Sequence, residues 1–396
     1  MSRFVTVTLS DLGKTITGKT PSSESPKDFG DEIPFITPSD SFEQKYISNP
    51  ERFLSSEGGR KLKGKLLLPE SIMVTCIGSA MGKVAMTTRQ SITNQQINSI
   101  IVDDTYSPDY IYYTLRNNYK LLRNAACGST ALPLLNKTDF DLLKVRVHKK
   151  KEEQKKIAAV LSTFDAKIEC NNRINAELEA MAKTLYDYWF VQFNFPDHNG
   201  QPYKSSGGKM VYNPTLKRQI PSGWESVLVG DVLSKVSNSK KVPNKEILIK
   251  GKLPVIDQSM DYIGGFTDDE NARLRVESAH IVFGDHTRIL KLINFDYARG
   301  SDGTQVLISK VENIPAHLFF QMLSKIDLSS YGYARHFKFL KESVIILPNK
   351  DIAIKYEAVA KGIYRKIKHG IFENQHISQL RDWLLPMLMN GQVTVV

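Results

Sequence analysis

Eight residues near the start of the chain have the spacing of a phosphate-binding loop. The stretch GKTITGKT, residues 13–20, fits the pattern G-x-x-x-x-G-K-[ST], in which backbone amides and the lysine hold the phosphates of a nucleotide. Further on, SIIVDD at residues 99–104 is an apolar run that ends in acid, and such enzymes use that acid to hold magnesium. One hypothesis is therefore a P-loop nucleotide triphosphatase that acts on nucleic acid.

The elements around this motif argue against nucleotide binding. A phosphate-binding loop needs a buried strand before it and a helix after it, because the N-terminus of that helix faces the phosphates. The stretch that follows, PSSESPKDFGDEIP, contains Pro21, Pro26 and Gly30 and shows no helical apolar period. We therefore interpret the motif as a basic, turn-forming surface loop, with Lys14 and Lys19 as candidate contacts to nucleic-acid phosphates.

Other catalytic signatures are missing from the sequence. It contains no H-E-x-x-H, no G-x-S-x-G, no glycine-rich dinucleotide fingerprint after a strand, and no Pro-Pro dipeptide of the kind that amino-methyltransferases use to grip a flipped base. Cys76, Cys127 and Cys170 are far apart and lack cysteine or histidine neighbours at metal-ligand spacing. The sequence therefore predicts inert thiols, no catalytic residues and no metal site.

The most informative pattern is an internal repeat. FVTVTLSDL at residues 4–12 matches WESVLVGDV at residues 224–232, and the same offset of 220 carries IPFI (33–36) onto LPVI (253–256). At this offset the second half does not keep the glycines and the lysine of GKTITGKT. The two halves thus share one mixed α/β ground plan, and the phosphate-loop pattern is not part of it.

Each half runs into a long helical stretch, residues 151–190 and 352–390. Apolar residues recur at spacings of three and four, which predicts one apolar seam along a helix, and at 1.5 Å per residue the first helix would be roughly 60 Å long. Each seam carries one asparagine at the matching position, which favours pairing of the two helices in a fixed register as a coiled coil. The predicted seam and register residues are Phe164, Ile168, Asn171, Ile174, Ile367, Ile371, Asn374 and Ile377.

Charge points to a polyanionic partner. The formal net charge is +11 and the pI is about 9.3, so the surface attracts nucleic acid. Several loops combine side chains that suit guanine edges and phosphates (Arg, Lys), adenine edges (Asn, Gln) or stacking (Tyr). The predicted DNA contacts are Lys14, Lys19, Arg89, Asn94, Gln95, Gln96, Ser129, Gln258, His286, Arg288, Arg299, Tyr331, Tyr333, Arg335, His336 and Lys338.

Taken together, several segments resemble the specificity subunit of type I restriction-modification systems. They are GKTPS followed by IPFITPSD, then GSTALPLLNKTDFDLLKV, then EEQKKIAAVL at the start of the first long helix, and RDWLLPMLMNGQV near the end. The resemblance implies two target-recognition domains that each read half of a split double-stranded DNA site, held apart by two antiparallel helices. It also implies two methyltransferase subunits that use S-adenosylmethionine to methylate adenine at N6, and restriction/translocase subunits that use ATP and Mg²⁺. This chain would itself bind none of these cofactors.

We therefore expect an α+β fold in which two pseudo-repeated recognition domains are each followed by a long helix, and the two helices pair as an antiparallel coiled coil. The expected order is recognition domain 1 (1–150), helix 1 (151–193), connector (194–220), recognition domain 2 (221–348), and helix 2 with the C-terminal tail (349–396). No apolar run reaches the ~18 residues of a membrane span and the start lacks a secretory signal, which predicts a cytoplasmic protein. Besides the nucleotide triphosphatase, the sequence leaves open a scaffold that binds partners without reading DNA.

Overall fold

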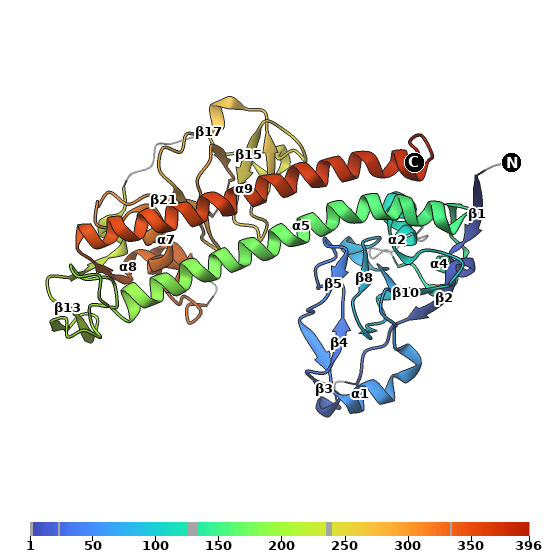
Figure 1. The fold of residues 1–396 in the computed structure, drawn as a ribbon, viewed down its shortest axis with the longest axis horizontal. Helices are drawn as coiled ribbons and strands as arrows, with labels where there is room; N and C mark the ends of the chain where they lie inside the picture. The colour runs from blue at the N-terminus through green and yellow to red at the C-terminus, as the bar shows by residue number, and fades with distance from the viewer. Residues whose placement is uncertain are drawn as a thin grey trace. The chain divides into compact units, whose positions relative to one another are not determined.

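The computed structural model describes residues 3–22, 24–125, 134–234, 240–301, 303–332 and 335–395. These residues divide into two compact units. Unit 1 comprises residues 1–172 and 372–396, and unit 2 comprises residues 173–371. Because each long helix crosses from one range into the other, both units contain a segment of each helix (Figure 1).

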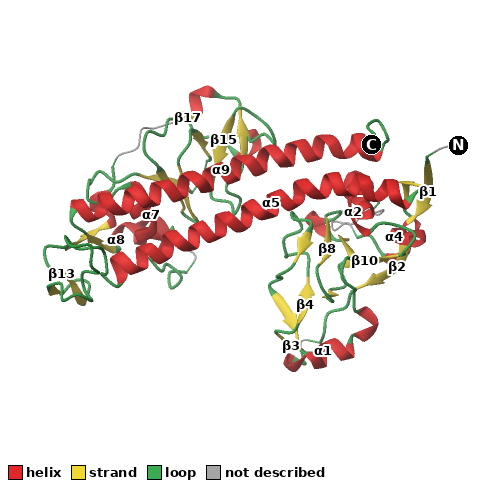
Figure 2. Ribbon diagram, in the orientation of Figure 1, coloured by secondary structure: helices red, strands yellow, loops and turns green. Residues whose placement is uncertain are grey.

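The described part of unit 1 holds three sheets and four short helices (Figure 2). Its strands are β1 (Phe4–Thr8), β2 (Gly13–Thr17), β3 (Phe29–Gly30), β4 (Ile33–Ile36), β5 (Tyr46–Ile47), β6 (Arg52–Leu54), β7 (Ile72–Thr75), β8 (Val84–Thr87), β9 (Ile92–Thr93), β10 (Ile97–Val102) and β11 (Lys144–His148). They pair as β1-β11, β2-β10-β7-β8-β5 and β3-β6-β4-β9. The helices are α1 (Ser56–Lys61), α2 (Pro108–Asn117), α3 (Tyr119–Asn124) and α4 (Lys137–Leu142).

Helix α2 forms the centre of the main core of unit 1. Pro108 opens the helix, where a fixed φ and a missing N–H cost nothing. Tyr110, Tyr112 and Tyr113 are fully buried and pack in one cluster with Leu161 of the first long helix. The five-stranded sheet is thereby held to that helix through α2.

Unit 2 has the corresponding architecture. Its strands are β12 (Met210–Asn213), β13 (Arg218–Pro221), β14 (Glu225–Leu228), β15 (Leu253–Ile256), β16 (Gly265–Thr267), β17 (Arg273–Leu274), β18 (His280–Gly284), β19 (Leu290–Ile293), β20 (Tyr297–Arg299), β21 (Thr304–Leu307) and β22 (Val344–Leu347). They pair as β12-β13, β14-β22, β16-β15-β20-β17 and β19-β18-β21. The short helices are α6 (Val229–Val232), α7 (Ala316–Ser324) and α8 (His336–Glu342).

The internal repeat is visible in the pairing of the strands. In unit 1 the first and last strands pair with each other, as β1-β11. In unit 2 the first strand after the β12-β13 hairpin pairs with the last one, as β14-β22. The parallel pair β4-β9 corresponds to β15-β20, and the antiparallel set β10-β7-β8 corresponds to β21-β18-β19. A short helix precedes the last strand in both units. The predicted fold class is therefore confirmed.

The two long helices are α5 (Lys151–Tyr186) and α9 (Lys350–Met389), shown green and red in Figure 1. A π-helical turn, Asp187–Val191, continues α5. In unit 1, Asn171 of α5 donates to Asn374 Oδ1 of α9 at 2.9 Å. In unit 2, Tyr356 of α9 donates to the carbonyl of Ala182 of α5 at 3.3 Å. A second contact in each unit gives the direction: Asp165 pairs with Arg381 in unit 1, and Asn175 lies against Gly370 in unit 2. Within each unit the residue numbers therefore fall along α9 as they rise along α5, so the helices pair antiparallel.

Helix α9 is continuous through Gly370 and Pro386, the residues that make its sequence less regular than that of α5. A Cβ at Gly370 would lie 2.7 Å from Asn175 Oδ1 of α5. The glycine therefore allows the two helices to approach closely in unit 2, and it does not interrupt α9.

The predicted seam needs one correction, at Ile174. Its side chain is 48% exposed, while Asn171, Leu178 and Ala182 are buried or partly buried. At about 100° per residue, positions 171, 175, 178 and 182 stay on one face, whereas position 174 lies about 60° to the side. The contact stripe therefore passes through Asn175 and not through Ile174. Of the other predicted seam residues, Ile367 is buried and Phe164, Ile168, Ile371, Asn374 and Ile377 are half-buried.

Candidate nucleic-acid interface

Three loops of unit 2 meet where the parallel strands β15 and β20 end. Parallel strands end at the same edge of a sheet, so Gln258 after β15 lies near the turn after β20. The loop between β18 and β19 reaches this edge too, because the backbone N–H of His286 donates to Gln258 Oε1 at 3.3 Å. A Cβ at Gly303 would lie 2.8 Å from the same oxygen, so glycine is required there. We call Gln258, His286 and Gly303 the reading edge of unit 2.

Asp285 holds this reading edge together. It is 4% exposed, and its backbone N–H donates to the carbonyl of Gly303 at 2.7 Å. Its own carbonyl accepts from the N–H of His336 at 3.1 Å, and its carboxylate accepts from the N–H of Phe337 at 2.8 Å. The last bond satisfies an amide that α8 leaves unpaired at its start. One buried residue thus joins the β18–β19 loop, the β20–β21 turn and the beginning of α8.

Cys76 forms the same junction in unit 1. Its N–H donates to the carbonyl of Gln96 in the β9–β10 turn at 2.8 Å, and its carbonyl accepts from the N–H of Leu135 just before α4 at 2.9 Å. The side chain is 2% exposed, and burial raises the pKa of the thiol to about 11. Cys76 is therefore a neutral, buried thiol at neutral pH. Its bonds to Gln96 and Leu135 come from its backbone, and its sulfur accepts a further bond from Asn98 Nδ2 at 3.3 Å.

The reading edge of unit 1 combines residues from two segments that are far apart in the sequence. Lys19 donates its N–H to the carbonyl of Thr93 at 2.9 Å, and Thr20 donates its hydroxyl to Gln95 Oε1 at 2.6 Å. The side chains of Lys19 and Gln95 are exposed, and Gln96 is half-buried. We call Lys19, Thr20, Gln95 and Gln96 the reading edge of unit 1.

Asn94, also predicted to contact DNA, lies beneath this edge. Its side chain is 8% exposed, and its Oδ1 accepts from the N–H of Gln96 at 3.0 Å. Its Nδ2 donates to Gln96 Oε1 at 3.2 Å. Asn94 therefore shapes the β9–β10 turn, and we no longer expect it to contact a base.

The interpretation of GKTITGKT as a turn-forming loop was wrong. Residues 13–17 form strand β2, which pairs with β10, the strand that contains most of SIIVDD. The β-branched run Thr-Ile-Thr favours an extended strand. The amides of Gly18 and Lys19 donate to the carbonyls of Ile97 and Thr93 at 3.2 and 2.9 Å, so neither is available to a phosphate. This backbone does not form a nucleotide-binding loop, and Lys14 and Lys19 lie at opposite ends of an extended segment.

Three of the predicted arginines make contacts within the fold. Arg89 is exposed and its guanidinium lies 5.7 Å from the ring centre of Phe53. Arg288 is exposed and donates to a backbone carbonyl at 3.3 Å. Arg299 is half-buried, donates to the carbonyl of Thr304 at 2.9 Å, and has its pKa lowered by burial. None of these three contacts a reading-edge side chain through a hydrogen bond among the residues that the structure describes.

The segment before α8 and the helix itself contribute exposed and buried residues. Tyr331 is 41% exposed and stacks on Phe339, and Arg335 and Lys338 are exposed. His336 is 5% exposed, and its ring nitrogens lie 2.9 Å from the carbonyl of Asp285 and 3.1 Å from that of Tyr331. His336 therefore supports the loop, and we no longer expect it to contact DNA. Ser129 and Tyr333, together with Cys127, lie outside the described residues.

Three supporting residues were not predicted from the sequence: Cys76, Asp285 and Lys291. Lys291 lies inside β19 and is buried; it donates to the carbonyl of Asp257 at 2.9 Å and to that of Asp261. Burial lowers the pKa of its ammonium group. A lysine within the apolar strand LKLI was the available signal, because a buried charge needs fixed partners. These contacts hold the loop that carries Gln258.

Among the described residues, no group of histidine, cysteine and acidic side chains is arranged to hold a metal ion. Nor does any helix in the described ranges combine the length and apolar character needed to cross a membrane.

Comparison with known proteins identifies similar chains. Residues 1–180 match the family model described as type I restriction modification DNA specificity domain. The chain is 28% identical over 416 residues to the type I restriction enzyme MjaIX specificity subunit of Methanocaldococcus jannaschii, covering 98% of this chain and 93% of that protein. It is 40% identical over 139 residues to the type I restriction enzyme HindI specificity subunit of Haemophilus influenzae, covering 35% of this chain and 30% of the relative.

A solved structure has the same fold. The crystal structure of the S subunit of a type I restriction-modification system from M. genitalium superposes with a TM-score of 0.56 and covers 98% of this chain and 96% of that chain. The two sequences are 17% identical, so the likeness concerns the arrangement of elements.

Proposed function

We propose that this chain, which belongs to the family of type I restriction-modification DNA specificity subunits, reads a bipartite, asymmetric duplex site with its two units. The observation that carries the proposal is the repeated junction. Cys76 and Asp285 make the same pair of backbone bonds in the two units, yet the side chains at the two reading edges differ. One scaffold that presents two sets of base-reading groups suits two different half-sequences.

The chemistry of each edge supports contact with base edges and phosphates. In unit 1, Gln95 and Gln96 offer amides that suit adenine, and Lys19 offers a cation for guanine or phosphate. In unit 2, Gln258 offers an amide and His286 a ring with a donor and an acceptor. The net charge of +11 supplies the sequence-independent attraction to the duplex.

The same proposal assigns catalysis to other chains. Two modification subunits would use S-adenosylmethionine to methylate adenine at N6, and restriction/translocase subunits would use ATP and Mg²⁺. This division is supported by the names of the relatives, which are specificity subunits of restriction enzymes. It is also supported by strand β2, whose amides are already bonded where a nucleotide-binding loop would need them. Because its ligand would be the DNA of the cell, the chain would act in the cytoplasm.

The long helices would set the distance between the half-sites. Helices α5 and α9 are continuous over 36 and 40 residues and each contributes to both units. The Asn171–Asn374 hydrogen bond fixes their relative register, as a buried polar pair does in a coiled coil.

Methylome sequencing tests the proposal directly. Cells that express this chain with its modification subunit should carry N6-methyladenine in one split motif, with two different half-sequences at a constant spacing. The motif should vanish when the gene for this chain is deleted. A methylome that is unchanged by the deletion would contradict the proposal.

Substitution of the unit 2 reading edge separates sequence recognition from simple scaffolding. Gln258→Ala and His286→Ala should each weaken binding to the cognate duplex by about 1–3 kcal/mol, because a base-specific hydrogen bond is lost. Binding to a duplex with the second half-site scrambled should not change, and titrations at fixed salt measure both.

The matched control is Lys338→Ala, which removes an exposed charge from α8. It should weaken binding to cognate and scrambled duplexes equally and reduce the salt dependence by about one unit of slope. A wild-type chain that binds both duplexes with equal affinity would favour the scaffold.

A further inference from the structure

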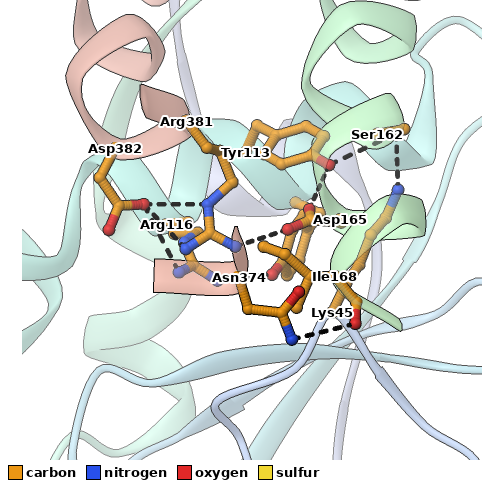
Figure 3. Close-up of polar contacts among 10 residues, drawn as sticks. Lys45, Tyr113, Arg116, Ser162, Asp165, Ile168, Asn374, Arg381 and Asp382 are labelled. Carbon is orange, nitrogen blue, oxygen red and sulfur yellow. Dashed lines mark hydrogen bonds and ion pairs between the residues drawn. The ribbon is translucent and has the colours of Figure 1, made fainter. Parts of the chain in front are cut away.

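A buried polar network in unit 1 joins the recognition fold to both long helices. Asp165 of α5 forms an ion pair with Arg381 of α9, with 2.5 Å between Oδ1 and Nη1, and their side chains are 9% and 7% exposed. The other oxygen of Asp165 accepts a hydrogen bond from the hydroxyl of Tyr113 in α2 at 2.5 Å. Figure 3 shows Asp165 between the two partners. Three elements that are far apart in the sequence thus meet on one carboxylate.

Further contacts close the network around a cavity of about 550 Å³. Arg381 also lies 2.9 Å from Asp382, whose carboxylate is 3.7 Å from Arg116 of α2. On the other side, Lys45 donates to Ser162 of α5 at 2.8 Å (Figure 3).

Lys45 is buried, because its side chain is 5% exposed, and it pairs with Asp109 at the start of α2 at 2.7 Å. The described cations that line this cavity are therefore matched by carboxylates. These ion pairs connect elements of the protein to one another.

Unit 2 lacks this network at the matching positions. The matching asparagines of the two helices, Asn171 and Asn374, are 203 residues apart. At this offset Asp165 corresponds to Lys368, and Arg381 corresponds to Leu178. Lys368 donates to the carbonyl of Asn294 at 3.2 Å, and Leu178 packs against the apolar core of unit 2. Unit 2 has other polar contacts between its recognition fold and α9, because His317 of α7 lies 2.6 Å from Glu357 and Gln321 of α7 donates to the hydroxyl of Tyr364 at 2.8 Å. The arrangement in which one carboxylate joins α2, α5 and α9 is therefore found in unit 1 and not at the matching positions of unit 2.

The network in unit 1 has a physical consequence. Apolar contacts are non-directional, so they tolerate small rotations as long as the buried area is kept. A buried ion pair with hydrogen bonds on both oxygens adds little net stability, but an orientation that separates the partners leaves a buried charge unpaired and is costly.

We propose that Tyr113, Asp165 and Arg381 are positioning residues, which hold the recognition fold of unit 1 at one orientation on the helix pair and thereby define the spacing at which its half-site is read. The inference rests on the proposed function. It concerns spacing only, because none of these residues belongs to a reading edge.

The test is the spacer preference of the complete enzyme. The variant Asp165→Leu/Arg381→Leu replaces the ion pair by an apolar pair, which buried pairs often tolerate without loss of stability. Methylation is measured on duplexes that keep both half-sites and change the spacer by one base pair in either direction. We expect the discrimination against the altered spacers to fall at least tenfold, with both half-sequences unchanged.

Two further variants keep the result decisive. Tyr113→Phe removes one hydrogen bond and leaves the ion pair in place, so it serves if the double variant does not fold, and it should weaken spacer discrimination in the same direction. Lys368→Met, at the repeat position of Asp165 in unit 2, should leave the spacer preference unchanged.

Unaltered spacer discrimination in a folded double variant, or in Tyr113→Phe where the double variant fails to fold, would overturn the inference, as would a change in a half-sequence. A wild-type enzyme with no split site would instead refute the proposed function.

Discussion

The variant Asp285→Ala should bind the cognate duplex roughly ten- to a hundredfold more weakly than the wild type. Its carboxylate accepts the N–H of Phe337 in the protein interior, and loss of a hydrogen bond to a buried charged group costs about 1.5–3 kcal/mol. Without that bond, only the backbone carbonyl of residue 285 links the β18–β19 loop to the start of α8, so the two segments are held to each other less firmly. We therefore expect Gln258 and His286 to lose their alignment, although neither is substituted.

The internal repeat supplies a matched control for this prediction. Cys76 occupies the same junction in unit 1, but its bonds to Gln96 and Leu135 are made by the backbone. Cys76→Ala should therefore keep the junction and change DNA affinity little. Asp285→Asn keeps an oxygen that can accept the N–H of Phe337 and should fall between the wild type and Asp285→Ala.

Two measurements check this set. Duplex titrations give the affinities, and amide hydrogen exchange over residues 284–289 reports whether the loop opens more readily. Wild-type affinity in Asp285→Ala would contradict the assigned role of the carboxylate. An equally large loss in Cys76→Ala would show that the side chain at this position matters in both units, for another reason.

The repeat and the long helices could be predicted because both leave patterns in the spacing of residues along the sequence. Matching strands such as IPFI and LPVI keep their spacing along the chain, and an apolar stripe over more than thirty residues is typical of a helix in almost any context. The exact stripe was harder to predict. A step of three residues from Asn171 places Ile174 in the seam, whereas the structure uses a step of four and places Asn175 there.

The reading edges could be predicted only in part, because strand order decides which loops meet. Lys19 and Gln95 are more than seventy residues apart, and only the pairing of β2 with β10 and of β4 with β9 brings them together. The sequence also did not indicate which of the predicted side chains are exposed. His336 and Asn94 have side chains that suit DNA, yet both are buried because the turns beside them need their hydrogen bonds.

The phosphate-loop pattern also shows that a short sequence motif does not determine the local structure by itself. GKTITGKT satisfies a short motif, but the motif specifies a loop only when its backbone can curl around an anion. Here Ile16 and its neighbours pair with Ser99 and the rest of β10, so the backbone amides are satisfied within a sheet. The acid at the end of SIIVDD likewise follows the partner strand of that sheet.

Lengthening both helices should change the spacing of the half-sites in a phase-dependent way. Four residues inserted after Asn172 in α5 and four before Phe372 in α9 would face each other in the antiparallel pair. They add about 6 Å, or about two base pairs at 3.4 Å each, and turn the faces beyond them by about 40°. Two base pairs of DNA turn by about 70° in the same right-handed sense. We therefore expect a methylated motif with the same half-sequences and a spacer about two base pairs longer.

An insertion of eleven residues in each helix should behave differently, although it preserves the contact stripe between the helices. It adds about 16.5 Å, or about five base pairs, but turns the helix faces by only about 20°. Five base pairs are half a turn of DNA, so the second half-site would face away from its reading edge. Methylation at any split site should then fall to background, while each unit keeps its own fold.

A four-residue insertion in the β12–β13 turn controls for chain length, because residues 214–217 lie outside both helices. It should leave the spacer unchanged. If the paired four-residue insertion altered a half-sequence or kept the original spacer, the helices would not determine the spacing. If the eleven-residue variant methylated a site five base pairs longer, the units would have to reorient freely about the helix pair, which the ion pair between Asp165 and Arg381 is expected to prevent.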